Sequence, residues 1–343
     1  MIRTFACLLL LFAACGNAAG DAVPVRLDPL ALRVLLDDAR SRLDASGPQA
    51  GAEARAARIL GEPDPVLAEA LASVWIDRVV SRDRYDDTER KVLRRLEARE
   101  PAILVPHHEH PGRWMPALQV GRRAANLLDH ARRLDRADVL ADDGRALREA
   151  LLAGEEPRVV DLVIDRLEAA DRPALATWLL PRIGSGSAID RAALRLGRTA
   201  SDADLLQVLV EAGNVDAARA ALLHGIDSAH ADLALMAESA LGRPEIGGLA
   251  VSALLAADPE QGRDRLWGLL GSEAFGADAA RRLAAEPADL VAGVEEAWGG
   301  ASPLARLRMR LALQLAATPE TLELAATIGR EPDRSAPGPE VRR

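Results

Sequence analysis

Apolar residues in the C-terminal half of the chain recur at the spacing of an α-helix. One such stripe consists of Ile246, Leu249, Ala250, Ala253 and Leu254, at positions i, i+3, i+4, i+7 and i+8. Segments of this kind, about 12 to 15 residues long, follow one another from Pro157 to Gly329. Helices of that length are only marginally stable in isolation. We therefore expect each of them to bury its apolar face on its neighbours.

Helix starts are indicated by a capping residue followed by proline. The side chain of Asp, Ser or Thr accepts hydrogen bonds from the free N–H groups of the first turn, and proline tolerates the first helical position because it has no N–H to satisfy. The pair occurs at Asp64-Pro65, Asp258-Pro259, Ser302-Pro303 and Thr318-Pro319. Nearer the N-terminus, an extended stretch at Val23–Val25 precedes an amphipathic segment from Leu30 to Leu43. The pattern thus predicts helices in both halves of the chain.

The turns that precede the apolar segments recur at a nearly constant interval. Pro157, Ser201, Pro244 and Pro287 are 44, 43 and 43 residues apart, and Pro319 follows after 32. This texture resembles the HEAT and armadillo class of helical repeats, whose units of about 40 to 47 residues contain two or three helices. The resemblance implies an α-solenoid over roughly residues 151–330. A competing register of paired helices every 30 residues is left open.

Composition supports a helical fold. Aromatic residues make up 3% of the chain and hydrophobic residues 49%, which favours helix over a sheet-based architecture. We predict an all-α protein with an irregular helical region at 21–150, the repeats at 151–330 and a disordered tail at 331–343. If the repeats form a groove, the side chains that follow each landmark turn are expected to line one wall. Only Ala102–Val105 is typical of a strand.

The N-terminus has the features of an export signal. Arg3 precedes an uncharged apolar run from Thr4 to Ala14, which is too short to span a bilayer. We predict a signal peptide at 1–20. The segment around Cys15 resembles the lipobox of bacterial lipoproteins, although Phe12 stands where leucine is usual. The resemblance implies lipidation of Cys15 and, because no aspartate follows it, a location in the periplasm at the outer membrane.

An ordinary signal-peptidase site at Gly16–Ala18 is the alternative to lipidation. Beyond the leader the chain contains no cysteine, so disulfides and thiolate ligands are excluded there. The formal net charge of −9 argues against nucleic acid as a partner, because an acidic surface repels phosphate. Contact with a membrane is expected only through an N-terminal lipid.

Three of the six histidines lie together in the segment His107-His108-Glu109-His110. An aliphatic run leading into a His-x-His pair resembles the zinc sites of metallohydrolases, but the residues that follow do not match. His130, on a helix predicted from Pro116 to Leu134, is a further candidate ligand. The bracketing Pro106 and Pro111 favour a different interpretation, in which the segment is a solvent-facing loop between two helical segments.

Two functions are compatible with these features of the sequence. The first is a non-catalytic scaffold of the cell envelope that binds a protein partner through its helical repeats. The second is a metal-dependent hydrolase or metal-binding protein that uses zinc at His107, His108 and His110. No motif specific to a catalytic chemistry is present, so the first is preferred and the chain is not expected to be an enzyme.

Overall fold

The computed structural model describes residues 23–45, 52–80, 82 and 84–328. The prediction of a mainly helical protein is confirmed, since 73% of the described residues are helical and these residues form 18 α-helices. A three-stranded sheet is the exception to the all-α prediction. The predicted signal peptide, with its lipidation candidate Cys15, and the predicted disordered tail lie outside the described residues.

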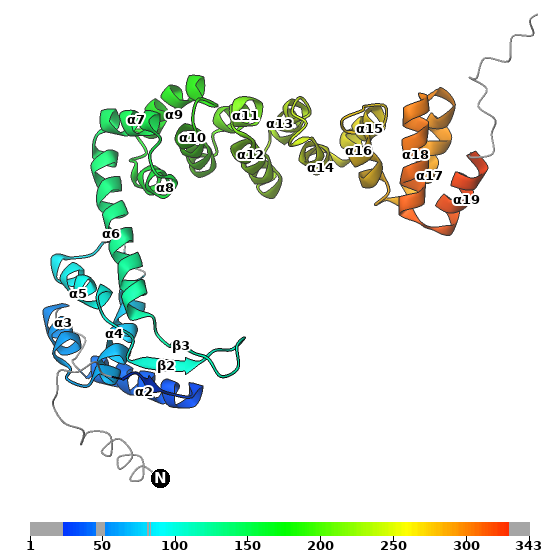
Figure 1. Cartoon of the computed structure of the whole chain (residues 1–343). Coiled ribbons are helices and arrows are strands. Elements are labelled where there is room, and N and C mark those ends of the chain that lie inside the picture. The colour runs from blue at the N-terminus through cyan, green and yellow to red at the C-terminus, as the bar shows by residue number, and fades with distance from the viewer. Residues whose placement is uncertain (1–22, 46–51, 81, 83, 329–343) are drawn as a thin grey trace, which may run out of the picture. The chain divides into compact units, whose positions relative to one another are not determined.

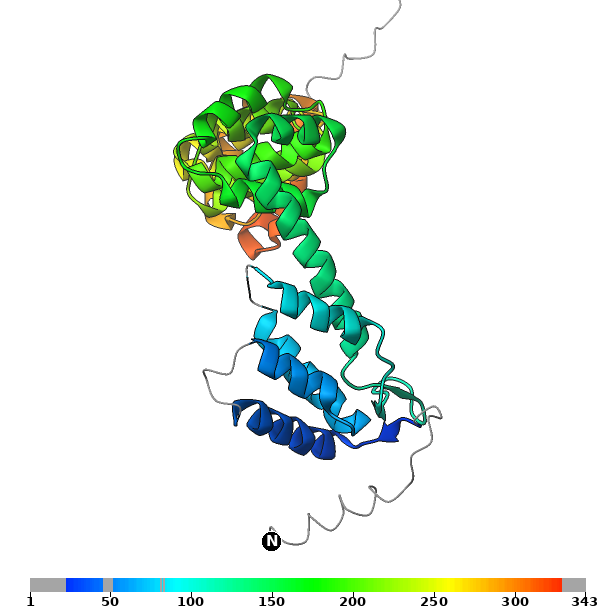
Figure 2. The same cartoon turned by 90° about the vertical axis from the view of Figure 1, so that its left-hand side faces the viewer.

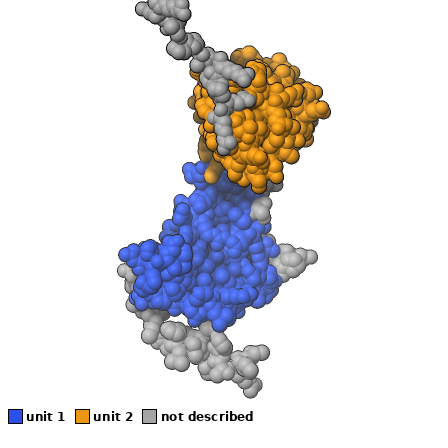
Figure 3. Space-filling view, turned by 90° about the vertical axis from the view of Figure 1, so that its right-hand side faces the viewer, with its two compact units in different colours: residues 1–135 blue, residues 136–343 orange. Residues whose placement is uncertain are grey.

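The chain divides into two compact units, residues 1–135 and residues 136–343, which are coloured separately in Figure 3. The division falls inside the helix α6 (Val120–Asp142), whereas the sequence places the change of organisation near residue 150, within helix α7 (Gly144–Ala153). Within the described residues, no helix is both long enough and apolar enough to cross a membrane.

The first unit combines four helices with the sheet and the start of α6 (Figure 1). Its elements are β1 (Val25–Arg26), α2 (Pro29–Asp44), α3 (Ala52–Gly61), α4 (Pro65–Val79), α5 (Asp87–Glu97), β2 (Ile103–Pro106), β3 (Trp114–Pro116) and α6 (Val120–Asp142). Helix α4 is buried along nearly its whole length and packs on α2 and α3. β2 pairs in parallel with β1 and antiparallel with β3.

The elements of the second unit in its described part, residues 136–328, are helices, which follow one another in sequence order in Figure 1 and overlap when viewed at right angles in Figure 2. They are α7 (Gly144–Ala153), α8 (Pro157–Arg166), α9 (Arg172–Leu179), α10 (Ser187–Ala200), α11 (Ala203–Ala212), α12 (Val215–Asp227), α13 (Leu233–Ala240), α14 (Gly247–Ala257), α15 (Pro259–Leu269), α16 (Gly276–Leu283), α17 (Pro287–Ala297), α18 (Pro303–Ala316) and α19 (Pro319–Ile328). The predicted cap-and-proline starts at 64–65, 258–259, 302–303 and 318–319 are all helix starts.

Helices in this unit contact the second helix along the chain as well as the next. In particular, α8, α10, α12, α14, α16 and α18 form a series in which each member contacts the following one. These six helices begin 27 to 32 residues apart. Side chains on successive members pair at the same interval: Arg191 Nε lies 2.8 Å from Asp161 Oδ1, and Arg195 Nη2 lies 2.7 Å from Asp165 Oδ2. The contacts therefore recur about every 30 residues, which is the interval of the paired-helix register.

The 43-residue landmarks have a different origin. They precede α8, α11, α14 and α17, which is every third helix. Because α8 and α14 belong to the series just described while α11 and α17 lie between its members, successive landmarks alternate between two sets of helices. The expectation that the side chains after each landmark line one wall is therefore wrong. One helix with its turn is the basic step, and both intervals are multiples of it.

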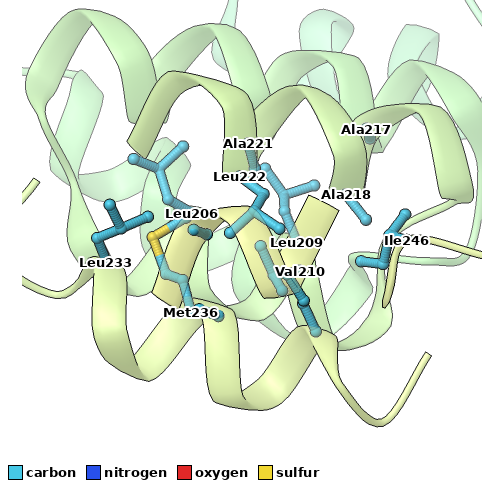
Figure 4. Close-up of a cluster of buried hydrophobic side chains, with 14 of the residues drawn as sticks. Leu206, Leu209, Val210, Ala217, Ala218, Ala221, Leu222, Leu233, Met236 and Ile246 are labelled. Carbon is cyan, nitrogen blue, oxygen red and sulfur yellow. The ribbon is translucent and has the colours of Figure 1, made fainter. Parts of the chain in front are cut away.

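Small side chains allow the helices to approach closely. Between α11, α12 and α13, leucines and Met236 interdigitate with alanines such as Ala218 and Ala221, which are fully buried (Figure 4). A Cβ atom at Gly225 would lie 3.1 Å from Leu233. Interiors of this density leave little room for larger residues. The aliphatic composition is thus a direct requirement of the packing.

A buried carboxylate holds two turns of this unit together. Asp190, on α10, is 1% exposed. It accepts hydrogen bonds from the Gly184 N–H at 2.7 Å and from the N–H and Nδ2 of Asn214 at 2.8 and 2.7 Å. Gly184 has φ +86°, and a Cβ there would collide with the Ala212 carbonyl. Asp190 therefore joins the turn before α10 to the start of α12.

We expect Asp190→Ala to lower the free energy of unfolding by about 3 kcal/mol, because the three hydrogen bonds to this buried carboxylate are lost together. Urea denaturation followed by circular dichroism measures the loss. The control is Asp227→Ala, which removes an exposed carboxylate at the end of α12. A change in the Asp190 variant no larger than that of the control would contradict the role given to this side chain.

Candidate functional site

The strand that leads to the histidines is positioned by a buried glutamate. Glu69, on α4, is 1% exposed, and its Oε2 accepts hydrogen bonds from the N–H groups of Ala102 and Ile103 at 2.5 and 2.8 Å. Its other oxygen is buried without a hydrogen bond. Burial raises the pKa of Glu69, against the lowering effect of these hydrogen bonds and of Arg99. Helix α4 and β2 are thus joined by one side chain.

The histidine segment is the turn of a β-hairpin. The His107 N–H donates to the Arg113 carbonyl at 2.9 Å, the Arg113 N–H donates to the His110 carbonyl at 3.1 Å, and Gly112 has φ +84°. The predicted exposure is confirmed, since His108 and His110 face solvent. The predicted context is wrong, because the turn joins strands β2 and β3 and not two helical segments.

The three imidazoles lie together, with the ring of His107 stacked on that of His108 and tilted by 41° against that of His110. The ring centroid of His107 is 5.2 Å from that of His108 and 4.7 Å from that of His110. Nδ1 of His107 accepts a hydrogen bond from the Glu109 N–H at 3.2 Å. Within the described residues, no group of three or more His, Cys, Asp or Glu side chains is placed to hold a metal ion. The structure brings the predicted residues together, with ring faces and not ring nitrogens directed at one another.

His130 has a different neighbour. It lies on α6, which begins at Val120 and not at the predicted Pro116, because Pro116 ends β3. Its ring meets that of Tyr85 edge-on, with centroids 6.3 Å apart. Tyr85 is 5% exposed, and burial raises the pKa of its hydroxyl. His130 is therefore part of a packed cluster of α6 and the segment before α5.

An aromatic contact beside the hairpin turn could not be read from the sequence. Trp114, the first residue of β3, is 38% exposed. The guanidinium carbon of Arg26, on β1, lies 5.0 Å from the centre of its ring, within cation–π range. The two residues are 88 positions apart along the chain and meet only because β1 and β3 flank β2. The sequence carries no signal for this pairing, because the two residues belong to different segments.

In the second unit, α15 to α17 with the end of α14 surround a small surface pocket. Its walls include Leu255, Leu266 and Leu290, with Arg263 at the rim. Arg263 forms ion pairs with Glu286 and with Asp289. The pocket has room for about one water molecule, whereas small-molecule sites usually measure about 300 to 1,000 Å³. The charged side chains around the pocket are thus already paired with one another between helices.

The surface of the second unit also carries exposed apolar side chains. Leu152, Leu223 and Leu235 are isolated examples, each on a different helix. Helix α18 differs, because Leu307, Leu311 and Leu315 recur every four residues on one face. Contiguous apolar surface of this kind marks interaction sites more often than single exposed leucines do.

Comparison with known proteins yields no match to a family model, to a curated protein or to a solved structure.

The raised pKa of Glu69 predicts a pH-dependent contribution to stability. A folded-state pKa above the unfolded value means that the native state binds the proton more tightly, so this contribution is greatest at low pH and declines as pH rises through the folded pKa. We expect the stability of Glu69→Gln relative to wild type to increase as pH rises from about 4 to 7.

Urea denaturation across this pH range measures the difference. Glu97→Gln, at an exposed position on α5, is the control for the loss of one charge. A relative stability of Glu69→Gln that stays constant or falls with rising pH would contradict the assignment.

Proposed function

We propose that the chain is an exported protein of the cell envelope whose helical repeats bind a protein partner without catalysis. Its second unit is an α-solenoid of the HEAT/armadillo-like class in the short, paired-helix form. The observation that carries the proposal is the recurrence of contacts at about 30 residues along α8 to α18. Repeats that contact only their neighbours generate a long surface, and such surfaces suit protein partners.

Polar side-chain pairs between consecutive members of the series from α8 to α18 support this interpretation. Asp161 with Arg191, and Asp165 with Arg195, link α8 to α10, while Arg282 lies 3.1 Å from the Ser252 hydroxyl between α16 and α14. All three pairs span 30 residues. Exposed ion pairs add little to stability, about 0 to 1 kcal/mol each. Their repetition at the same interval instead keeps the helices of the series in one register along the surface.

Export follows from the predicted leader. We propose that residues 1–20 direct the chain to the periplasm and that Cys15 is lipidated, which anchors the protein at the outer membrane. Cleavage at Gly16–Ala18 without a lipid is the alternative. In either case the repeats are presented to partners outside the cytoplasm.

Photo-crosslinking in intact cells tests the proposal. A crosslinking residue at Arg219 on α12 or at Leu235 on α13, both exposed, is expected to capture a protein partner, whereas the same residue at the exposed Arg94 of α5 is not. Cys15→Ser should release the protein from the membrane fraction and leave the crosslinks in place. Crosslinks confined to Arg94, or none from the repeats, would contradict the proposal.

A second candidate function rests on the proximity of the rings of His107, His108 and His110. Rotation of the exposed imidazoles would let their nitrogens bind zinc, for which neutral histidine is a good ligand. This would make the chain a metal-binding protein or a metal-dependent hydrolase.

Metal analysis of protein purified without a histidine tag separates the two candidates. The binding-module proposal predicts the same low zinc content in wild type and in the His108→Ala, His110→Ala double variant. Arg113→Ala, in the same turn, is the control for disturbance of the hairpin. Stoichiometric zinc that is lost only in the double variant would favour the second candidate.

A further inference from the structure

The most exposed apolar side chains of the described protein lie close to its first described residue. Val23 is 87% exposed and Leu30, in the first turn of α2, is 72% exposed, which are the two highest values among the large hydrophobic residues of the described ranges. Val34, one helical turn after Leu30, is 51% exposed on the same face of α2. Single exposed apolar residues are common, whereas three of them within twelve positions mark an interaction site. We call Val23, Leu30 and Val34 the N-terminal apolar patch.

The helix that carries this patch lacks negative charge at its start. The whole chain has a formal net charge of −9, yet residues 29–36 of α2 contain Arg33 and no acidic residue. Asp28, which precedes them, caps the helix, and its Oδ1 accepts a hydrogen bond from the Ala31 N–H at 2.8 Å. Anionic lipid headgroups repel acidic surfaces and attract arginine. This part of an acidic protein is therefore compatible with close approach to such headgroups.

An accessible pair of tryptophan and arginine belongs to the same end of the first unit. Arg26, the last residue of β1, is separated from α2 by two residues, and its guanidinium stacks on the ring of Trp114. Both views place α2 and the hairpin at the lower end of this unit (Figure 1, Figure 2). The hairpin turn adds one basic residue, Arg113, and one acidic residue, Glu109. Tryptophan and arginine favour the boundary between headgroups and acyl chains, because each combines an apolar body with a polar end.

The proposed lipid anchor would hold this end of the chain at a membrane. Cys15 is eight residues before Val23, so the connecting chain spans at most about 28 Å when fully extended. Residues 16–22, which remain after processing at Cys15, consist of glycine, alanine, asparagine and aspartate. They contain no large apolar side chain that could cover the N-terminal apolar patch. The patch would thus be exposed within a short distance of the bilayer.

We propose that the N-terminal apolar patch, together with Trp114 and Arg26, binds the surface of the phospholipid bilayer to which the chain is anchored. The inference rests on the proposed lipidation of Cys15 and adds a contact between the folded protein and the membrane. A tether keeps the local concentration of the patch at the bilayer high, so a few apolar and cationic side chains are sufficient for binding. The first unit is thereby held against the bilayer with α2 at the interface.

Chemical attachment of Cys15 to a lipid tests the proposal independently of lipidation in cells. The chain from residue 15 onward contains no other cysteine, so Cys15 can be coupled to a maleimide-bearing lipid in vesicles of phosphatidylethanolamine and phosphatidylglycerol. A photo-crosslinking residue at the exposed Ala31 of α2 is expected to form phospholipid adducts that mass spectrometry detects. The same residue at the exposed Arg94 of α5, in the same unit, should form none.

A charged variant of the patch gives the matched comparison. Leu30→Glu combined with Val34→Glu should abolish the lipid adducts at Ala31, because two carboxylates replace apolar contacts at an anionic surface. Leu223→Glu combined with Leu235→Glu, at exposed leucines of the second unit, should leave the adducts unchanged. Circular dichroism should give the same helical spectrum for both double variants, since all four positions are exposed.

Absence of lipid adducts at Ala31, equal adducts at Arg94, or adducts that survive the charged variant of the patch would each overturn the proposal. Crosslinks from Ala31 to a protein and not to lipid in intact cells would also overturn it. Failure of the underlying lipidation is recognised separately. In that case Cys15→Ser would fractionate with membranes to the same extent as wild type, whatever the vesicles show.

Discussion

The second unit depends on one constraint, which is that none of its helices is long enough to be stable alone. They contain 8 to 14 residues, below the length at which an isolated helix persists in water. Each helix therefore has to bury its apolar face on others, and the contacts of α8, α10, α12, α14, α16 and α18 with the following member of this series are one result. Near the end of the array, α18 contacts α16, α17 and α19 on its buried side and keeps Leu307, Leu311 and Leu315 exposed on the other.

Close packing in this array is achieved with small residues. Gly247 lies against the ring of Phe275, and Gly293 lies against that of Trp267, so that a Cβ at either position would collide with the ring. The rings of Phe275 and Trp267 therefore each pack against a position that only glycine can occupy. Polar interactions have a different role. The ion pairs between α8 and α10 are largely exposed and contribute little free energy. The buried carboxylates of Glu69 and Asp190, in contrast, fix the positions of a strand and of a turn.

Much of the local structure could be predicted. Asp64, Asp258 and Ser302 cap their helices because a cap depends on residues two or three positions away. The strand beginning at Ile103 and the exposure of His108 were also predictable. The partner strands, the ring stacking of His107 and the contact between Arg26 and Trp114 were not, because they depend on segments brought together across the sheet. The burial of Glu69 and Asp190 could not be predicted, since an acidic residue in a helix is ordinarily solvated.

By itself, the sequence determined that the described chain is mainly helical, where many of its helices begin, and that their apolar faces must be buried on one another. These properties arise from hydrogen bonds and side-chain spacing within a few residues. The tertiary structure decided which helices become neighbours. Two helices with their turns span about 30 residues and three span about 43. The sequence is therefore compatible with either register. Only the docking of α8 on α10, with Asp161 beside Arg191, selects the shorter one, because that choice depends on contacts between residues far apart along the chain.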